Sequence, residues 1–377
     1  MRQPWLLVSG DFVPWGGMDR ANFALASRLA ATGDEVHLVT HRASEALSRC
    51  GAIVHRVMRP GGAHALGMPL LARAARRRAH ELRGRRVKVV GNGGNCIWPG
   101  IAWVHYVHAA YDSREGAGLV PRAIAAAQRR YVLDRERRAL QQARAIVCNS
   151  RRTQRDVVDR LGVPPERTHV IYYGTDPAEF GPIDAGEREA ARGAWGIAGD
   201  RPVALFVGAL GDRRKGFDLL FEAWARLCQR GDWDADLLVA GEGRELPAWR
   251  ARAEAEGLQA RVRFLGYRRD VPRLLAAADL LVHPARYEAY GLAVHEAICR
   301  GVPAMVSGEA GVAERYPAAL APLLLNELSG DALHRALRSW RAGRTGLSAA
   351  AATASAEWRS RTWDKMADEI ADLGRAM

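Results

Sequence analysis

The sequence lacks the features that would place it in a membrane, in an oxidising compartment or around a structural metal. Its 377 residues contain no run of about 18 apolar residues, which argues against a membrane-spanning helix. The first residues, MRQPWLLVSGDF, have no signal-peptide hydrophobic region and no small-residue cleavage site. The five cysteines include no Cys-x-x-Cys pair, so neither a zinc site nor a disulfide framework is expected. These absences predict a cytoplasmic chain with reduced thiols.

Lysine is also scarce, since the chain has three lysines and 52 arginines. The net charge of +13 is uneven: residues 1–170 hold 28 Lys and Arg against 13 Asp and Glu, whereas the remainder holds 27 against 29. Two explanations stay open, an acidic surface or ligand that meets the N-terminal half and an arginine-rich genome composition. Nucleic acid is a poor candidate, because basic and aromatic residues do not interleave and no binding motif is present.

Short apolar runs bounded by Gly, Pro or Asp alternate with helical patterns along the chain. This alternation is typical of a parallel α/β sheet covered on both faces. The first series of expected strands comprises residues 5–10, 35–40, 52–57, 87–92, 101–106, 145–150 and 168–174. The second series comprises residues 202–210, 235–243, 261–266, 279–284 and 302–307.

The stretch 175–200 is rich in Gly, Pro and acidic residues and holds no strand, which indicates a linker and the first helix of a second domain. We therefore expect two doubly wound domains, residues 1–174 and 175–357, because the length suits about two cores. Ligands are expected where the carboxyl ends of the strands of both domains face a central cleft.

A segment near the end of the second series carries two glutamates, in YEAYGLAVHEAICRGVPAMVS. Glu288 falls in the loop after an apolar strand, Gly291 at a helix N-terminus and Glu296 about one turn inside that helix. Carboxylates accept hydrogen bonds from sugar hydroxyls, and free N–H groups at a helix start attract phosphate. From the residues alone, a nucleotide-sugar site and a pair of solvated helix charges both remain open.

The same segment resembles the most diagnostic part of the retaining glycosyltransferases of family 4, which have the GT-B fold of two Rossmann-like domains. The resemblance implies that Glu288 contacts the transferred sugar and that Glu296 holds the ribose. It also implies that the amides of Gly291 and Leu292 reach the phosphates, with Tyr290 as a further donor contact.

Other segments extend the resemblance over nearly the whole chain. FVPWGGMDRANF resembles the glycine loop after the first strand, and FVGALGDRRKGFDLL resembles the loop that grips the diphosphate. The arginine of that second loop falls on Ala209 here, so Arg213 or Arg214 is left to replace its charge. FLGYRRD resembles the segment that cradles the nucleobase. The donor residues implied by these segments are Gly16, Gly17, Arg214, Lys215, Tyr267 and Arg268.

The acceptor side is expected around WVHYVHAAYD in the N-terminal half. The family commonly places one histidine at this strand tip, near the anomeric carbon. The pattern favours His105 as that histidine, with His108 as the second choice. The expected catalytic residues are therefore His105, Lys215 and Glu288. His108, Tyr111 and Asp112 are the expected acceptor contacts. No carboxylate lies beside His105, which favours a same-face mechanism in which the leaving phosphate oxygen deprotonates the acceptor.

The resemblance thus implies a metal-independent, cofactor-free hexosyltransferase that retains anomeric configuration. Its donor would be a UDP- or GDP-sugar, and its acceptor a glycan, a lipid-linked sugar or a small molecule of cell-surface polysaccharide or glycoconjugate synthesis. Two alternatives stay open, a GT-B nucleotide-sugar epimerase and a non-catalytic sugar-nucleotide-binding protein, which Ala209 favours.

Two helical segments complete the expectations. The basic stretch 69–88, PLLARAARRRAHELRGRRVK, predicts an amphipathic helix carrying Leu70, Leu71 and Leu82. It suits either an anionic surface on the inner face of the cell membrane or a solvated basic helix face. The final segment 358–377 resembles the family's C-terminal helix that crosses back onto the first domain.

Overall fold

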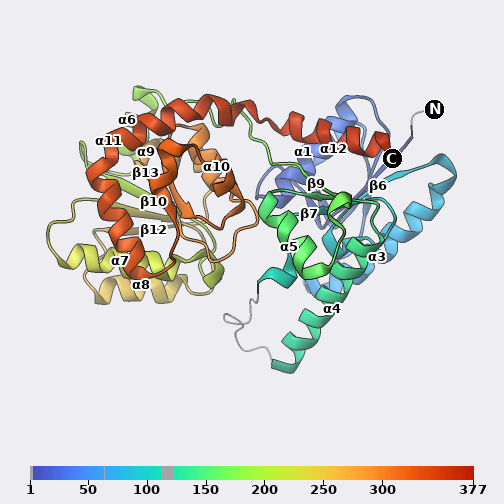
Figure 1. Cartoon of the computed structure of the whole chain (residues 1–377), viewed down its shortest axis with the longest axis horizontal. Coiled ribbons are helices and arrows are strands. Elements are labelled where there is room, and N and C mark those ends of the chain that lie inside the picture. Colours follow the sequence, from blue (N-terminus) through green and yellow to red (C-terminus); the bar gives the residue numbers. More distant parts are fainter. Residues whose placement is uncertain (1–2, 63, 112–121) are drawn as a thin grey trace. The chain divides into compact units, whose positions relative to one another are not determined.

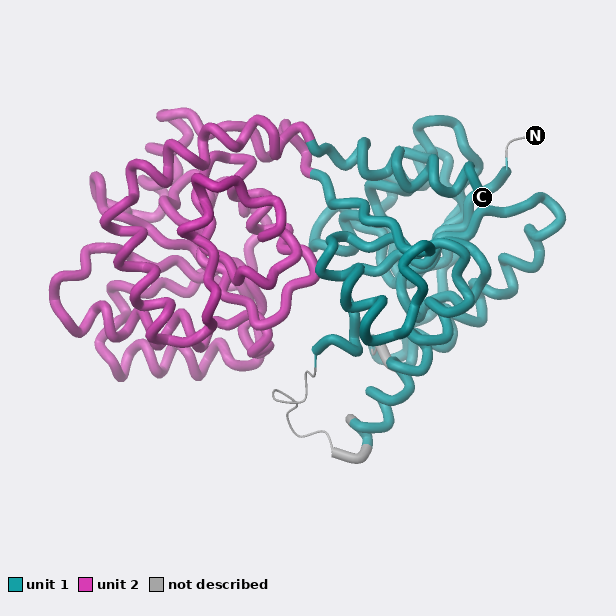
Figure 2. Tube along the Cα trace, in the orientation of Figure 1, with its two compact units in different colours: residues 1–174, 361–377 teal, residues 175–360 magenta. Residues whose placement is uncertain are grey.

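The computed structural model describes residues 3–62, 64–111 and 122–377 (Figure 1). The chain divides into two compact units, residues Met1–Gly174 with Arg361–Met377 (unit 1) and residues Thr175–Ser360 (unit 2) (Figure 2). Each unit is a parallel sheet with helices, and the predicted class of two α/β Rossmann-like domains is confirmed.

Unit 1 is built on a seven-stranded sheet whose strand pairs are all parallel. The strand order is β5 (Ile53–Arg56), β3 (Val36–Thr40), β1 (Trp5–Val8), β6 (Lys88–Asn92), β7 (Ile101–Val104), β8 (Ala145–Cys148) and β9 (Thr168–Val170). A separate pair joins β2 (Asp11–Phe12) to β4 (Arg42–Ala43). β1, β3, β7 and β8 are buried along their whole length, which explains their continuous apolar sequences.

The helices of unit 1 include the C-terminal one. They are α1 (Met18–Ala31), α2 (Glu45–Arg49), α3 (His64–Glu81), α4 (Arg122–Gln142), α5 (Arg151–Leu161) and α12 (Trp363–Ala376). α12 packs along α1, where Arg28 donates to Asp368 at 2.8 Å. α12 also lies close to the sheet, because Gly374 has no side chain: a Cβ there would lie 2.4 Å from the ring of Trp5 on β1.

Unit 2 is built on a six-stranded parallel sheet. Its order is β12 (Val262–Gly266), β11 (Asp236–Ala240), β10 (Val203–Val207), β13 (Leu280–His283), β14 (Ala304–Ser307) and β15 (Leu324–Leu325). Its helices are α6 (Ala185–Ala194), α7 (Phe217–Gln229), α8 (Leu246–Ala255), α9 (Val271–Ala277), α10 (Leu292–Cys299) and α11 (Gly330–Ser360). The chain order reverses between β10 and β13, and such switch points of open α/β sheets are where ligands bind.

The basic segment 69–88 uses its apolar side for the core of unit 1. Leu71 is 1% exposed and Leu82 is 7% exposed, and Leu71 packs with Ala75 and Ala79 against the β1 and β6 side chains. Only Leu70, 39% exposed, faces outward. An apolar helix face engaged by a sheet cannot also enter a bilayer, so the structure favours the solvated basic face over membrane insertion. Among the described residues, no helix is long and apolar enough to span a membrane.

Candidate functional site

Two loops meet at the switch point of unit 2, one after β10 and one after β13. The Arg286 N–H donates to the carbonyl oxygen of Arg214 at 2.8 Å, and the Arg286 guanidinium binds Asp218 at the start of α7. Arg214 in turn donates to the carbonyl of Tyr287 at 3.3 Å. These contacts lock the loops together, so residues 73 positions apart in the sequence share one site.

The centre of this site is an ion pair between Lys215 and Glu288. The Lys215 ammonium lies 2.7 Å from Glu288 Oε2, and His283 Nε2 lies 2.9 Å from the same oxygen. Burial alone would raise the pKa of Glu288, but Lys215 and the His283 hydrogen bond together hold it well below its ordinary value. Burial also lowers the pKa of His283, so this imidazole is neutral near pH 7 and its Nε2–H donates to the carboxylate. Glu288 is therefore an ionised acceptor facing a fixed cation.

The start of α10 offers free backbone donors beside that carboxylate. Gly291 caps the helix with φ 111°, and a Cβ there would lie 2.8 Å from Val312 Cγ1, so the turn needs glycine. The N–H groups of Leu292 and Ala293 have no acceptor among the described residues. Glu296, 7% exposed, follows one turn later. The predicted order of carboxylate, free amides and carboxylate is thus present in three dimensions.

The structure separates the two arginines proposed to replace the family's missing one. Arg214 is 17% exposed, is held by Asp212 at 3.0 Å and contributes positive charge at both His283 and Glu288. Arg213 is half exposed and pairs with Asp218 on α7. Arg214, which is bonded to Asp212 and to the Tyr287 carbonyl, is therefore the better of the two candidates to supply positive charge at this carboxylate.

Three predicted donor residues are used differently from expectation. Tyr290 is 1% exposed, and its hydroxyl is bonded to His295 Nδ1 at 2.6 Å and to Arg315 at 3.1 Å, so it is a packing residue. The Arg268 guanidinium binds Asp270 at 2.8 Å and stacks over the Trp195 ring. Tyr267 is exposed, at 52%. A nucleobase at this position could contact the backbone, whereas the Arg268 side chain is already engaged by Asp270 and Trp195.

In unit 1, a hydrogen-bonded cluster marks the switch point beside β1. Asn22 on α1 and Asn92 at the end of β6 both donate to Ser9 Oγ, at 3.0 and 2.9 Å. The glycine loop follows: Gly16 has φ 81°, and Gly17 caps the N-terminus of α1. Both glycines are open to solvent and could approach a ligand closely.

Asp19, in the first turn of α1, is a further candidate functional residue that the sequence did not suggest. Burial first, and the nearby charge of Asp11 second, raise its pKa to about 6. Asp11 itself is bound by Arg42 at 2.9 Å and Arg59 at 3.0 Å. This carboxyl beside the glycine loop can therefore take up a proton near neutral pH.

The two candidate histidines have opposite environments. His105 is 9% exposed, its Nδ1 is bonded to the Tyr173 hydroxyl, and its buried Nε2 has no partner within the described part of the chain. Burial lowers the pKa of His105 to about 3, so it is neutral at any working pH. His108 is 47% exposed. The preference for His105 as a ligand contact thus conflicts with its burial, and His108 is the accessible one.

Glu136 on α4, which the sequence did not single out, orients His108. Its carboxylate is 2% exposed and accepts from His108 Nδ1 at 2.9 Å, from the His108 N–H at 3.0 Å and from the Ala109 N–H at 3.3 Å. Because Nδ1 donates to Glu136, Nε2 of the neutral ring is left as an acceptor. Of the other acceptor predictions, Tyr111 is partly exposed and Asp112 lies outside the described residues.

We predict that Gly216→Ala will disrupt the loop pairing that creates the unit 2 site. Gly216 has φ 72°, and a Cβ there would lie 1.9 Å from the carbonyl oxygen of Pro284, which is backbone and cannot yield cheaply. Strain and overpacking together should lower the free energy of unfolding by about 2–4 kcal/mol. Chemical denaturation measures the change.

Gly257→Ala is the matched control for that substitution. Gly257 has φ 68° but no atom within 4 Å of its Cβ position, so it carries the backbone strain without the clash. Its cost should be about 1 kcal/mol. Equal losses in the two variants would show that the Pro284 contact is unimportant.

Known families match both halves of the chain. A model described as Glycosyltransferase Family 4 matches residues 15–179, and one described as Glycosyl transferases group 1 matches residues 187–351. The chain belongs to the family-4-like glycosyltransferases. The chain shares its GT-B fold with WaaG, whose crystal structure is described as that of a glycosyltransferase involved in lipopolysaccharide biosynthesis (TM-score 0.80, 23% identity, covering 98% of this chain and 99% of that one). Anabaena HepE, solved with UDP-glucose, also shares it (TM-score 0.76, 19% identity, 99% and 100%).

Curated relatives are more similar in sequence but over shorter lengths. The chain is 30% identical to the alpha-D-kanosaminyltransferase of Streptomyces kanamyceticus over 181 residues, 47% of this chain and 46% of that protein. It is 35% identical to the lipopolysaccharide glucosyltransferase WaaG of Escherichia coli over 150 residues, 40% of each chain. The chain thus spans less than half the length of these curated relatives.

Proposed function

We propose that this glycosyltransferase moves a hexose-type sugar from a UDP- or GDP-sugar to a glycan, lipid-linked or small-molecule acceptor, with retention of anomeric configuration. The observation that carries the proposal is the Lys215–Glu288 pair beside the free amides of α10 at the unit 2 switch point. HepE was solved with UDP and glucose and with UDP-glucose, which supports a nucleotide-sugar donor and puts UDP first among the candidates.

Each group of the site has a role in this reaction. Ionised Glu288 accepts hydrogen bonds from hydroxyls of the transferred sugar, and Glu296 accepts from the ribose. The amides of Leu292 and Ala293 bind the diphosphate, and Lys215 with Arg214 stabilises the charge that grows on it as it leaves. Because these two cations already supply positive charge, we propose that the reaction needs no metal.

The reaction that we propose is a displacement on one face of the sugar ring. The bond from the anomeric carbon to the diphosphate oxygen breaks, and a bond from the anomeric carbon to the acceptor oxygen forms on the same face. The proton of the acceptor hydroxyl passes to the departing phosphate oxygen. No enzyme carboxylate is used as a nucleophile.

Thermal-shift screening against UDP-, GDP-, ADP- and dTDP-sugars tests donor binding. We expect one class of donor to raise the melting temperature. With that donor, sugar transfer to an acceptor should proceed in the presence of EDTA. NMR of the product should show the same anomeric configuration, α or β, as in the donor. An isomerised nucleotide sugar would favour an epimerase instead. Binding without any turnover over a broad acceptor panel would favour a non-catalytic binding protein, and no shift with any donor would contradict the proposal.

We further propose that His108, oriented by Glu136, is the histidine near the anomeric carbon. The His108 N–H and Nδ1 contact Glu136 Oε1, whereas the Ala109 N–H donates to Oε2, so Glu136→Gln keeps only one of these two acceptor oxygens. It also removes the charge that holds Nδ1–H, so His108 Nε2 loses its fixed role as acceptor. We expect kcat to fall about tenfold or more, with the KM for the donor little changed. Nitrogen NMR of His108 should show a loss of the single Nδ1–H tautomer.

Asp134→Asn on the same helix is the control, because Asp134 pairs only with Arg138 among the described residues. It should leave kcat and the His108 tautomer unchanged. A Glu136→Gln enzyme with wild-type kcat would remove the positioning role, and full activity of His108→Ala would remove His108 from the reaction.

A further inference from the structure

A basic pocket lies at the edge of the unit 1 sheet opposite the glycine loop. Its volume is about 550 Å³, and it opens where strands begin: Lys88 is the first residue of β6, Ile101 is the first of β7, and Arg144 precedes β8. The cluster of Ser9, Asn22 and Asn92 marks the other, carboxyl edge of the same sheet. The basic pocket is therefore separate from every residue of the proposed reaction.

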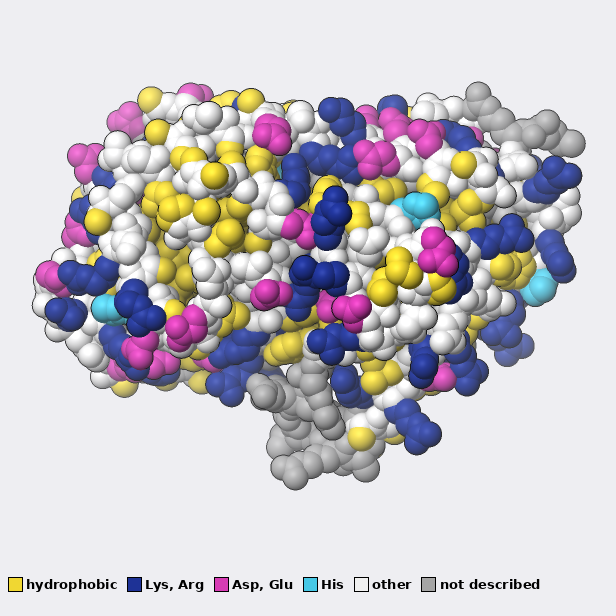
Figure 3. Space-filling view, viewed as in Figure 1, with side chains coloured by type: hydrophobic (Ala, Val, Ile, Leu, Met, Phe, Trp, Pro, Cys, Tyr) yellow, Lys and Arg dark blue, Asp and Glu magenta, His cyan; other side chains and the backbone are white. Residues whose placement is uncertain are grey.

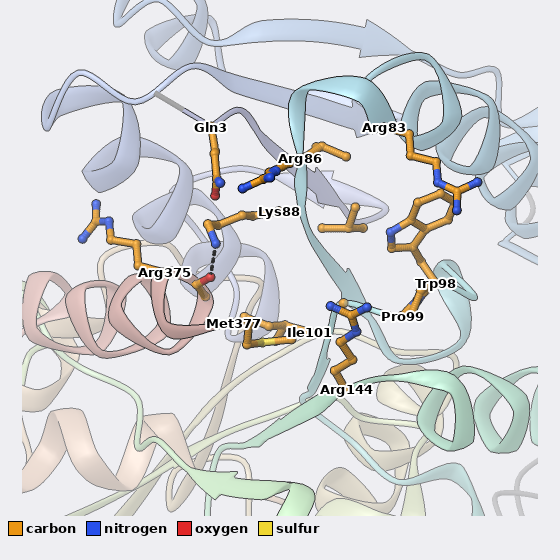
Figure 4. Close-up of a pocket in the computed structure, with 14 residues that line it drawn as sticks. Gln3, Arg83, Arg86, Lys88, Trp98, Pro99, Ile101, Arg144, Arg375 and Met377 are labelled. Carbon is orange, nitrogen blue, oxygen red and sulfur yellow. Dashed lines mark hydrogen bonds between the residues drawn. The ribbon is translucent and has the colours of Figure 1, made fainter. Parts of the chain in front are cut away.

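The lining of the basic pocket is cationic. Five cationic side chains line it, and none of the described lining residues is acidic. These cations are Arg83, Arg86, Lys88, Arg144 and Arg375. Figure 4 shows the Arg144 guanidinium and the Lys88 ammonium on different sides of the same space, with Arg83 and Trp98 at one end and Arg375 at the other. Figure 3 likewise shows basic side chains outnumbering acidic ones over the visible face of unit 1.

Three of these arginines are not engaged by carboxylates. Arg83, Arg86 and Arg144 are exposed and make no ion pair with any described residue. Their neighbours differ: Arg85 binds Glu35 and Arg78 binds Glu81, at 2.6 and 2.5 Å. Arg85 and Arg78 are thus neutralised by nearby carboxylates, whereas Arg83, Arg86 and Arg144 are not. The fourth arginine of the lining, Arg375, is paired with Asp34 at 3.0 Å and with Asp372 at 3.3 Å.

The remaining two cations are held close together by the fold. Lys88, which lines the pocket, donates to the carbonyl of Gly374 on α12, the bond that the dashed line in Figure 4 marks. Burial, and then the charge of Arg375, lower the pKa of Lys88. Bringing an anion into the pocket would relieve this repulsion.

The backbone conformation of Arg86 is a second observation that points to a role for this pocket. Arg86 has φ 54° and ψ 47°, and it is the only non-glycine residue with positive φ in the described part of the chain. Glycine or asparagine would adopt this left-handed conformation at lower cost. An arginine in that conformation at the mouth of a cationic pocket suggests that its side chain is needed there.

We propose that this basic pocket binds a phosphorylated ligand through a phosphate or diphosphate group. A phosphate carries up to two charges and three acceptor oxygens, which several guanidinium groups and an ammonium match better than a single carboxylate does. A second hollow of about 530 Å³ shares Arg83, Trp98 and Pro99 and adds Arg76 and Arg138. The apolar surfaces of Trp98, Pro99 and Ile101 lie beside the cations, so the ligand has an apolar part next to its phosphate.

The test uses the full chain with Arg83→Gln, Arg86→Gly and Arg144→Gln combined. Calorimetry with inorganic diphosphate should show that the triple variant binds at this site at least about tenfold more weakly than the wild type. Lys215→Ala, which removes one of the two cations of the donor site, should retain this binding, and this separates the two phosphate sites. Because Arg86→Gly relieves the backbone, the triple variant should melt no earlier than the wild type.

Co-sedimentation with vesicles identifies the source of the phosphate. Vesicles of phosphatidylcholine are compared with vesicles that also contain phosphatidylglycerol, and Arg49→Gln, an exposed arginine on α2, is the control in both assays. If the triple variant, unlike Arg49→Gln, loses binding to anionic vesicles, the phosphate belongs to a lipid. If the triple variant loses binding to diphosphate but not to anionic vesicles, the ligand is soluble. If the triple variant and the wild type bind both probes equally, or the wild type binds neither, the proposal is wrong.

Discussion

Lys215→Ala is expected to lower kcat/KM for sugar transfer by a factor of about 10²–10³, the usual effect of removing one preorganised charge-stabilising donor. The ammonium lies 2.7 Å from Glu288 and is 18% exposed, so it is desolvated enough for its charge to act strongly on a diphosphate. Arg214 should supply part of the lost charge. Steady-state kinetics with the donor identified by the thermal-shift screen measures the effect.

The same substitution should change how stability depends on pH. The pKa of Glu288 is held well below its ordinary value, so the ion pair stabilises the wild type above the unfolded-state pKa of about 4.3 and is lost as pH falls through the lower folded-state pKa. Without Lys215, burial dominates and the pKa of Glu288 rises. The variant should therefore lose most stability, relative to the wild type, near neutral pH, and the difference should shrink in acid.

Lys365→Ala is the control, because Lys365 is an exposed lysine on α12, far in sequence from both loops. It should leave both kinetics and stability unchanged. A Lys215→Ala enzyme with wild-type kcat/KM would remove Lys215 from the reaction, whatever its effect on stability.

The sheets could be predicted from the sequence because parallel strands that are buried on both faces have continuous apolar sequences. All twelve expected strands correspond to strands of the two sheets. The pair β2 and β4 and the edge strand β15 were missed, since strands of two residues carry no pattern. A helix was expected over 69–88, but α3 spans His64–Glu81, and the last residues of the expected helix form a 3₁₀ turn, Arg83–Arg85, and the start of β6 at Lys88. The pattern also could not tell a helix face that packs on the sheet from one that meets a membrane.

The site was predictable only in part, for physical reasons that differ between residues. The family motif placed Lys215 and Glu288 in one site, but only the folded loops show that they touch. His283 reads as part of an apolar strand, and its bond to Glu288 depends on where that strand ends. Glu136 lies in the charged run RRYVLDRERRAL and looks like a solvated helix residue. Tyr290 followed the motif, yet a sequence cannot show that its hydroxyl points into the core.

Glu288→Gln should lower kcat by a factor of about 10² or more, because the amide keeps the shape but loses the ionised acceptor that strengthens bonds to the sugar hydroxyls. Its side chain is 13% exposed, and the buried ammonium of Lys215 would lose its partner. Circular dichroism and the melting temperature would show whether the fold survives. Glu296→Gln, at the proposed ribose contact, is the comparison and should act mainly on the donor KM.

The double variant Lys215→Ala/Glu288→Gln decides what the ion pair does. If Lys215 serves only to hold Glu288, the double variant should be no slower than Glu288→Gln alone, because the interaction is already lost. If Lys215 also stabilises the leaving diphosphate, as we expect, the second substitution should cost a further factor of about ten or more in kcat/KM. Stability should move in the opposite sense: removing both charges leaves no unpaired ion in the buried loops, so the double variant should melt above Lys215→Ala. A double variant that is as fast as Glu288→Gln would confine Lys215 to positioning and leave Arg214 as the cation for the diphosphate.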